Sequence, residues 1–304
     1  MDLSIVIISY NTKDVLKNCI DSIAKYVKNL DFELIVVDNA SHDGSSEYLE
    51  KEAARGKVKI KLIKNKENVG FAAANNQGID ASSGDYILFL NSDTLFKNNF
   101  LKEMISWMER GDVGVAGVAL KNPDGSLQEN GGYFPGLMQV VSWMIFQDFI
   151  ITDWIVKPFH PLRGNSFLKN YSFYNKEREL DWLTGAFILV KRSVIDSGVR
   201  WCEDYFMYTE DVDFCFQVKR AGFRVVYNPR WSIIHFGGAS GTRERTVISE
   251  FAGIKIFYKR NYSKLKYPFL ILFLKIGALG RAILFFLLGK RELSSIYAKA
   301  FKKI

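Results

Sequence analysis

The feature that most limits the fold of this chain is a regular alternation of strand and helix patterns along its first 120 residues. Short, continuous apolar runs, such as LSIVIIS at 3–9 and FELIVVD at 32–38, are typical of parallel strands that are covered on both faces. Between these runs apolar residues recur at helical spacing, as they do from Thr12 to about Lys28. The repetition predicts an α/β layer structure around a doubly wound, mostly parallel sheet flanked by helices.

The same patterns continue along the chain. We expect further strands at 58–64, 85–91 and 113–120, and further helices at 45–54, 71–81 and 98–110. Residues 122–180 are irregular and rich in aromatic side chains. After them we expect a loop, a strand and a short helix within 181–198, then a helix near Asp211, and then a strand that ends at His235 before a Gly-rich loop.

Polar side chains stand where three of the predicted strands end, at Ser9, Asp38 and Asn91–Asp93. Ligands of open α/β sheets bind at the carboxyl ends of the strands, so we expect these groups to converge on one crevice. Asn, Ser and Asp also favour turns, and a plain strand-to-helix connection is the alternative for the segment FLNSDTLF. In the functional interpretation, Asp93 presents its carboxylate to a cation or a diphosphate.

Three other sites have both a functional and a structural interpretation. Glu210 and Asp211 fall near the start of a predicted helix, where acids compensate the helix dipole, although the aromatic residues beside them would also raise the proton affinity of a general base. His235 is either a structural residue or a ligand for Mn²⁺ or Mg²⁺. The N–H groups at Gly70 and Phe71 suit an anion or a simple turn. We expect His42 and His160, the remaining histidines, to be surface or turn residues.

Charge and cysteine content limit the class of protein. The net charge of +8 is concentrated at the C-terminal end, because residues 255–304 hold 12 Lys and Arg against one acid, Glu292, and the first 254 residues carry −3. A basic tail on a mildly acidic body does not indicate a nucleic-acid-binding protein. The three cysteines show no paired spacing, which favours a reducing cytoplasm, and the N-terminal sequence MDLSIVIISY does not read as a signal peptide.

The basic tail also contains the most apolar stretch of the chain, PFLILFLKIGALGRAILFFLLG at 268–289. Its length suits a membrane-spanning helix, but Lys275 and Arg281 would each cost about 2.5–3.5 kcal/mol at the bilayer centre and nearly cancel the apolar gain. We therefore expect one or two helices that lie in the membrane interface, with basic flanking residues, and the alternative is a helix buried in the protein.

Seven segments, taken in order over residues 3–240, resemble glycosyltransferase family 2, the inverting nucleotide-sugar transferases with the GT-A fold. They are SIVIISYN, IVVDNASHDGS, ENVGFAAANNQGI, GDYILFLNSD, DWLTGAFILVKR, YFMYTEDVDFCFQVKRAG and IIHFGGAS. The pattern is most similar to the branch that includes bacterial rhamnosyltransferases and galactofuranosyltransferases.

The resemblance implies a donor pocket in which Tyr10 and Asp38 hold the nucleotide base. It places the rest of the nucleotide-sugar contacts at Ser9, Asn11, Asn68, Gly70, Phe71, Asn75, Asn91, Ser92 and Asp93. It implies a divalent cation, Mg²⁺ or Mn²⁺, held by Asp93 and His235 against the donor diphosphate. The segment NSD departs from the family's D-x-D at Asn91, which puts in doubt any role of that first position beyond a hydrogen bond.

The resemblance also implies the catalytic side of the pocket. Asp211 matches the base that takes the acceptor's proton and Glu210 is its neighbour, while Trp182, Thr184 and Gly185 match the acceptor side. Inversion by a single displacement needs such a base and a neutralised leaving group.

The resemblance implies an enzyme in two parts. Residues 1–250 form the GT-A catalytic domain, with a nucleotide-sugar half at 1–120 and an acceptor half at 121–250, and residues 251–304 form a membrane-association segment. The expected donor is dTDP-rhamnose or a UDP-sugar, the acceptor a lipid-linked saccharide or polysaccharide, and the location the inner face of the cytoplasmic membrane. Aromatic residues in the irregular region face acceptor or bilayer, or else pack normally: Trp143, Phe146, Phe149, Trp154 and Phe159.

Other functions stay open. A sugar-phosphate nucleotidyltransferase needs a Gly-rich loop after the first strand, and here that position reads SYNTKDVLKN without glycine. The same segment argues against a Rossmann dehydrogenase, which also needs a Gly-rich motif after the first strand. A catalytically silent GT-A-like membrane scaffold is harder to exclude, and Asn91 is the sequence feature that favours it.

Overall fold

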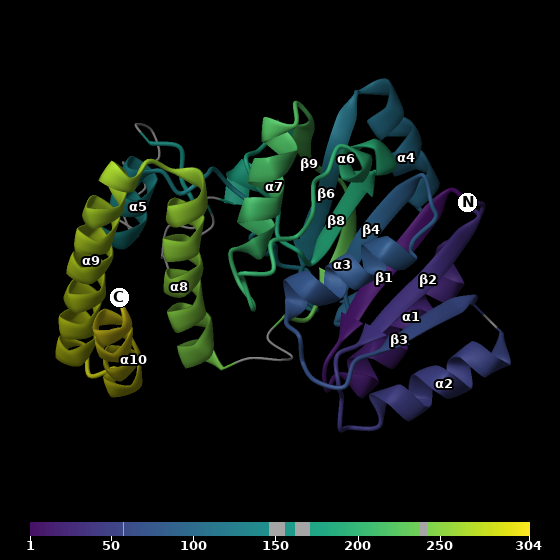
Figure 1. Ribbon diagram of the computed structural model, residues 1–304, viewed down its shortest axis with the longest axis horizontal. Helices are drawn as coiled ribbons and strands as arrows, with labels where there is room; N and C mark the ends of the chain where they lie inside the picture. The colour runs from purple at the N-terminus through teal and green to yellow at the C-terminus, as the bar shows by residue number, and fades with distance from the viewer. Residues whose placement is uncertain (57, 146–155, 162–170, 238–241) are drawn as a thin grey trace.

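The computed structural model describes all of residues 1–304 except 57, 146–155, 162–170 and 238–241. Within the described residues the chain builds one nine-stranded sheet, in the order β3-β2-β1-β4-β8-β6-β9-β5, with β7 added to β9. Helices cover both faces of this sheet, and a further group of helices stands at one end of the molecule (Figure 1).

The N-terminal half follows the predicted strand–helix alternation. Its parallel strands are β1 (Leu3–Ser9), β2 (Phe32–Asp38), β3 (Ile60–Lys64) and β4 (Tyr86–Asn91). Its helices are α1 (Lys13–Tyr26), α2 (Ser45–Arg55), α3 (Phe71–Ala81) and α4 (Leu101–Arg110). Every residue of β2 after Phe32 is buried, as a strand covered on both faces requires. Most bounds lie within two residues of those predicted; α4 begins three residues later than expected.

The second half makes the sheet mixed. Strand β8 (Phe187–Lys191) is antiparallel to both β4 and β6 (Val113–Lys121), whereas β6 and β9 (Arg224–His235) are parallel. Two-residue strands β5 (Thr94–Leu95) and β7 (Arg178–Glu179) pair with β9. The sheet is therefore mostly parallel, as predicted, with an antiparallel insertion that joins the two halves.

Two apolar cores lie on the two faces of the sheet. One contains Leu16 of α1, Leu49 of α2 and Met104 of α4. The other contains Ile79 of α3 and Phe214 of α7 (Glu210–Arg220), with the short helix α6 (Arg192–Asp196) at its edge. Figure 1 shows α1, α2 and α3 around the N-terminal strands and α7 beside β9. The sheet thus holds its strand ends rigidly between two packed layers.

The C-terminal helices pack onto the second core. They are α5 (Leu137–Ile145), α8 (Arg243–Asn261), α9 (Tyr267–Leu287) and α10 (Arg291–Lys303), and short 3₁₀ turns lie at Tyr171–Tyr174 and Lys264–Lys266. Leu274 of α9 and Ile254 of α8 are fully buried in this core. Trp143 is buried there too, so ordinary packing explains it. Phe159 is also buried but lines a cavity at the strand ends, and Phe146, Phe149 and Trp154 lie outside the described residues.

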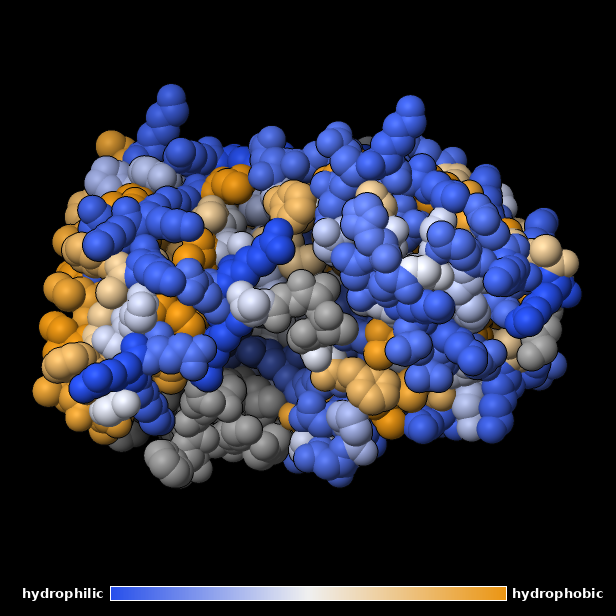
Figure 2. Space-filling model, turned by 90° about the horizontal axis from the view of Figure 1, so that it is seen from below, coloured by the Kyte–Doolittle hydropathy of each residue, from blue (hydrophilic) through white to orange (hydrophobic). Residues whose placement is uncertain are grey.

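The outer face of α9 is apolar and exposed. Among the described residues, one helix, Lys264–Leu287, is long and apolar enough to cross a membrane, with a mean hydropathy of 2.2 and 28% of its most apolar window buried. Figure 2 shows hydrophobic side chains gathered at this end of the molecule. They include Phe269, Leu272, Ile276, Leu279, Ile283, Phe286 and Leu287. The last predicted element therefore exists as a helix with one buried face and one bare apolar face.

Candidate active site

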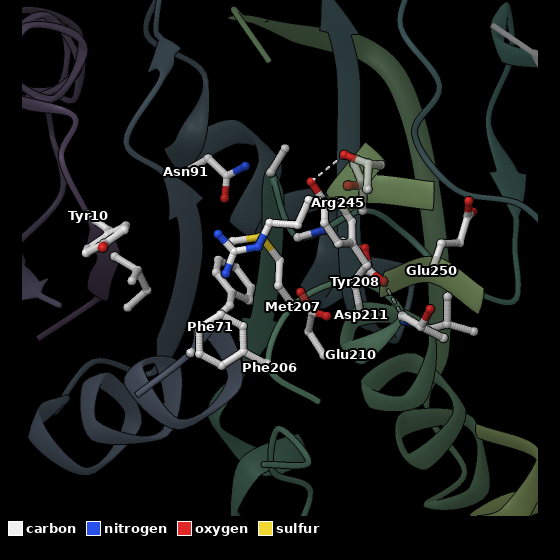
Figure 3. Close-up of a pocket in the computed structure, with 18 of the residues that line it drawn as sticks. Tyr10, Phe71, Asn91, Phe206, Met207, Tyr208, Glu210, Asp211, Arg245 and Glu250 are labelled. Atoms are coloured by element: carbon white, nitrogen blue, oxygen red, sulfur yellow. Dashed lines mark hydrogen bonds between the residues drawn. The ribbon is translucent and has the colours of Figure 1, made fainter. Parts of the chain in front are cut away.

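A cavity of about 370 Å³ opens at the carboxyl ends of β1 and β4. Figure 3 shows it extending from Tyr10 on one side, past Asn91 and Asp211, to Glu250 on the other. It gathers most of the residues singled out from the sequence, namely Tyr10, Asn68, Gly70, Phe71, Asn91, Ser92, Asp93, Trp182, Thr184, Gly185, Glu210, Asp211 and His235. Segments up to 225 residues apart in the chain thus meet in one place.

Strand register explains this convergence. Ser9 pairs with Asp38 across β1 and β2, and Ile8 pairs with Asn91 across β1 and β4, so the three polar strand ends are neighbours. The predicted meeting of these ends is therefore observed. A different pairing, Thr94 with His235 across β5 and β9, brings the end of β9 beside the NSD segment.

Four of the expected donor residues stand behind the cavity wall rather than on it. Ser9 is fully buried and bonds the Thr12 hydroxyl, and Asn75 donates to the Phe71 carbonyl within α3. Asn11 accepts from the His42 backbone in a turn. Asp38 is 2% exposed, and within the described part of the chain its Oδ1 has no hydrogen-bond partner. A buried carboxylate oxygen without a donor is costly, which marks it as a place for a ligand N–H.

Asp93 and His235 form a compact pair at the base of the cavity. Oδ1 of Asp93 lies 3.4 Å from Nε2 of His235, and the Asn91 amide nitrogen lies at the same distance from Nε2. The backbone supports the pair, because the Phe236 N–H donates to the Asp93 carbonyl at 3.0 Å. A carboxylate oxygen and an imidazole nitrogen facing one point are donors that Mn²⁺ accepts.

The orientation of the His235 ring is set by Gln128. Oε1 of Gln128 lies 2.7 Å from Nδ1 of His235, and the Gln128 amide nitrogen donates to the His235 carbonyl and to Asn122. Because that oxygen only accepts, Nδ1 carries a proton, and Nε2 is the ring nitrogen that faces Asp93. Metal-binding histidines characteristically donate their other ring N–H in this way. The residues present therefore fit a divalent cation.

Glu210 and Asp211 begin α7 after a strained turn. Tyr208 and Thr209 both adopt positive φ angles, 72° and 74°, which side chains other than glycine rarely adopt. This turn aims the first residues of α7 at the cavity, where Figure 3 shows Asp211 facing inwards. Gly70 packs against the same segment, since an added Cβ would stand 2.8 Å from the Phe206 carbonyl oxygen.

The two neighbouring acids have different surroundings. Oδ2 of Asp211 accepts from the Gly185 N–H at 3.1 Å, and Oδ1 accepts from the Val212 N–H at 2.9 Å. Burial raises the pKa of Asp211 to about 6 although these N–H groups act in the opposite direction. Burial and the Asp211 charge raise the pKa of Glu210 well above its usual value, and Oε2 of Glu210 has no partner in the described residues. Asp211 is thus the better base at neutral pH.

Sequence patterns missed several groups at the cavity. Asn39 organises the donor edge, because its amide donates to Asn68 at 2.8 Å and its oxygen accepts from the Val69 N–H. His160 was expected at the surface, but its side chain is 17% exposed and lies between two carboxylates, whereas His42 is exposed as expected. The other unforeseen lining residues include Met207, Arg245, Thr246 and Glu250. Phe159, for which an acceptor-facing position was one of two expectations, and Phe206 and Tyr208, which are aromatic neighbours of the acids, line the cavity as well. For Asn39, its place next to Asp38 at the end of β2 was a usable signal.

Comparisons with known proteins agree with this geometry. The model of the family described as "Glycosyl transferase family 2" matches residues 4–175. An N-acetylglucosaminyl-diphospho-decaprenol L-rhamnosyltransferase of Mycobacterium tuberculosis is 24% identical over 254 residues, 80% of this chain and 78% of that protein. The rhamnosyltransferase WbbL of Escherichia coli K12 is 28% identical over 152 residues, which cover 50% of this chain and 52% of that protein. This chain spans only a quarter of another relative, an uncharacterised Sinorhizobium fredii protein that is 25% identical.

Solved structures show the fold. A mannosyltransferase of Pyrobaculum calidifontis, in complex with GDP-Man and Mn²⁺, aligns with 98% of this chain and 73% of its own at a TM-score of 0.57 and 15% identity. Residues 1–349 of Staphylococcus aureus TarS, in complex with UDP-GlcNAc, align with 99% of this chain and 91% of that structure at a TM-score of 0.54 and 14% identity. The predicted GT-A architecture is confirmed.

Proposed function

We infer that this chain, which belongs to glycosyltransferase family 2, moves a sugar from a nucleoside diphosphate donor to a saccharide acceptor with inversion, and uses Asp211 as the base. One observation carries the proposal: the ionisable carboxylate of Asp211 and the Asp93–His235 pair line one cavity at the strand ends. The chain is a glycosyltransferase; the inverting mechanism and the roles of these residues are proposed.

Asp211 supplies the proton acceptor. With a pKa of about 6 it is ionised at neutral pH, and the N–H groups of Gly185 and Val212 fix both of its oxygens. In the reaction the acceptor's hydroxyl oxygen forms a bond to the anomeric carbon, the bond from that carbon to the donor diphosphate breaks, and the hydroxyl proton passes to Asp211. Glu210, the neighbouring acid, is the less readily ionised of the two.

Asp93 and His235 would hold the divalent cation, Mg²⁺ or Mn²⁺. When bound there, the cation would neutralise charge on the leaving diphosphate as a Lewis acid. Gln128 keeps Nε2 of His235 directed at Asp93, and Asn91 adds an uncharged amide beside Nε2. Although Asn91 carries no charge, Asp93 and His235 would still supply two protein ligands to the cation.

The donor base would lie beside Tyr10 and Asp38. The unpartnered Oδ1 of Asp38 supports this assignment, because the ring N–H of a uracil or thymine would satisfy it. Rhamnose from dTDP-rhamnose is the preferred donor sugar, since two relatives bear the name rhamnosyltransferase. A UDP-sugar is the second candidate.

We also propose that residues 251–304 attach the enzyme peripherally to the inner face of the cytoplasmic membrane, where a lipid-linked acceptor would lie. The mycobacterial relative's name specifies a diphospho-decaprenol acceptor. Arg281, counted from sequence as a charge in the bilayer, instead points into the protein, where it donates to the Trp143 carbonyl and is 8% exposed. Lys275 remains exposed, and its ammonium lies 5.7 Å from the Phe301 ring centroid.

Calorimetry with dTDP, UDP and GDP, each in Mn²⁺ or in EDTA, tests the proposal. We expect a pyrimidine nucleotide to bind in Mn²⁺, to bind far more weakly in EDTA, and to lose its metal dependence in Asp93→Ala. Asp196→Ala, at an exposed position of α6, is the matched control. Absence of nucleotide binding under both conditions would contradict the transferase function and favour the silent scaffold.

A further inference from the structure

A cluster of three ionisable side chains forms the cavity wall farthest from Tyr10. Nδ1 of His160 lies 3.2 Å from Oε1 of Glu129, and Nε2 of His160 lies 2.9 Å from Oε1 of Glu250. Glu129 follows β6, His160 lies in the irregular region, and Glu250 belongs to α8. His160 and Glu250 line the cavity together with Asp211.

The imidazole of His160 is held as a cation. A carboxylate only accepts hydrogen bonds, so a ring with a carboxylate at each nitrogen needs both protons. Burial opposes the charge, but the carboxylates of Glu129 and Glu250 outweigh it and raise the pKa of His160 to about 10. The cation pairs with Oε1 of Glu250, which itself lines the cavity.

Trp182 adds an unused donor to the same wall. Its side chain lines the cavity, it is 6% exposed, and its ring centroid lies 5.7 Å from that of His160 and 5.6 Å from that of Phe159. Its indole N–H has no hydrogen-bond partner within the described residues. A buried tryptophan N–H normally finds one, so a ligand acceptor at this position would satisfy it.

Charge indicates the class of ligand. Two carboxylates around one imidazolium carry a net −1, and the ionised Asp211 stands close by, so this wall repels a phosphate. Arg245, another cation of the cavity, lies over the Phe206 ring at 5.7 Å, and Figure 3 shows it between Phe71 and Tyr208 rather than beside Glu250. A neutral ligand with hydroxyl groups fits this wall, since each hydroxyl accepts from an N–H and donates to a carboxylate.

We propose that Glu250, the Trp182 N–H and the aromatic faces beside them form a subsite for an uncharged sugar ring of the acceptor, and that His160 is a positioning residue that holds Glu250. The proposal rests on the proposed transferase function for the direction of transfer. It adds the residues that would recognise the acceptor, of which His160 and Glu250 belong to none of the family-like segments.

Saturation-transfer difference NMR tests this subsite directly. The probes are the methyl glycosides of N-acetylglucosamine, glucose, galactose and rhamnose, measured with the full chain in UDP and Mn²⁺ so that donor contacts are occupied. We expect at least one glycoside to receive saturation from the wild type. The signal should fall about tenfold in Glu250→Gln and severalfold in Trp182→Phe, which removes the N–H and keeps an aromatic ring. His160→Gln should resemble Glu250→Gln.

Glu244→Gln is the matched control, because Glu244 lies on the same helix and pairs with Lys299 of α10 instead. Its signal should equal that of the wild type. The proposal is overturned if no glycoside receives saturation, if Glu250→Gln and Trp182→Phe both bind normally, or if glucose 1-phosphate binds better than methyl glucoside. UDP calorimetry on the same samples separates the two ideas: saccharide binding without UDP binding would contradict the transferase function and leave the subsite standing.

Discussion

At the residue scale, the main feature is a pair of adjacent acids with different protonation. We expect Asp211→Asn to lower kcat by about 10²–10⁴-fold and to leave nucleotide binding intact, because the variant keeps the shape of the side chain and loses the base.

The wild-type enzyme should also depend on pH. Its kcat/KM should fall as the pH drops through about 6, since protonation removes the base and burial has raised the pKa of Asp211 to that value. Transfer kinetics between pH 5 and 8 measure both effects.

Asp196→Asn, on the short helix α6, is the control for this substitution. A pH profile that stays flat down to pH 5, or an Asp211→Asn variant with normal kcat, would remove Asp211 from the role of base.

A second prediction at this scale concerns Gln128, which touches neither substrate nor the expected cation. Gln128→Leu removes the acceptor at Nδ1 of His235 and frees the ring to turn, so Mn²⁺-dependent nucleotide affinity should fall about 10–100-fold. Affinity in EDTA should be unchanged. Calorimetry measures both, with Gln139→Leu at a half-buried position of α5 as the control. Equal losses with and without Mn²⁺ would indicate a general disturbance of the cavity.

Site residues that lie within recognisable sequence motifs could be predicted. Site residues whose role depends on partners far away in the chain could not. The pairing of Thr94 with His235 brought Asp93 and His235 together, and the resemblance had linked them in advance. His160 carries no local signal, because its partners stand 31 and 90 residues away and its neighbours follow no period. Its side chain was therefore misjudged as a surface group.

At the element scale, continuous apolar runs gave the strands and the 3.6-residue period gave the helices. The sequence pattern did not indicate the direction of each strand relative to its neighbours. Nothing in FILVK reveals that β8 lies antiparallel between β4 and β6. The two-residue strands were invisible for a related reason, since a period cannot be read from two residues. Yet β5 sets the distance between Asp93 and His235, so a small element determines the site.

Helix α8 packs against the other C-terminal helices on one side and against the turn before α7 on the other. A Cβ at Gly253 would stand 2.7 Å from both the Thr209 Cβ and the Tyr208 carbonyl oxygen, inside the strained turn that aims Asp211. Gly253→Ala should lower the free energy of unfolding by about 1–3 kcal/mol and reduce kcat, because the helix or the turn must move. Thermal unfolding and transfer assays measure these effects.

Gly280→Ala on α9 is the control, because an added Cβ there meets no atom of the described residues within 4 Å. It should be neutral or stabilising by up to about 1 kcal/mol. A Gly253→Ala protein with normal stability and kcat would show that α8 and the turn adjust to each other freely.

At the scale of the whole molecule, the proposed attachment to a membrane depends on the two faces of α9. Leu270, Leu274 and Ala278 of α9 pack inside, while Leu272, Ile276, Leu279 and Ile283 are exposed at the spacing of one helix face. Both faces are apolar, so composition did not separate a buried helix from a membrane helix. In the structure one face of the helix belongs to the core and the other is exposed.

The charges at the ends of α9 distinguish lying on the bilayer from crossing it. Lys264 and Lys266 precede the helix and Lys290 and Arg291 follow it. A spanning helix would put these pairs on opposite sides, whereas a helix lying in the interface puts both against one anionic leaflet, and its buried face stays on the protein. Attachment should therefore need anionic lipid and weaken with salt, because each basic residue near the surface contributes about 1 kcal/mol that ions screen.

Vesicle co-sedimentation measures this. We expect binding to phosphatidylglycerol vesicles in 50 mM NaCl, little binding to pure phosphatidylcholine, and release in 0.5 M NaCl. The triple variant Leu272→Gln, Ile276→Gln and Leu279→Gln should bind at least about 100-fold more weakly, since it removes three large apolar side chains from the contacting face. Protein that resists both salt and alkaline carbonate and needs detergent for release would instead span the bilayer, and the packing of α9 against α5 and α8 would then have to open.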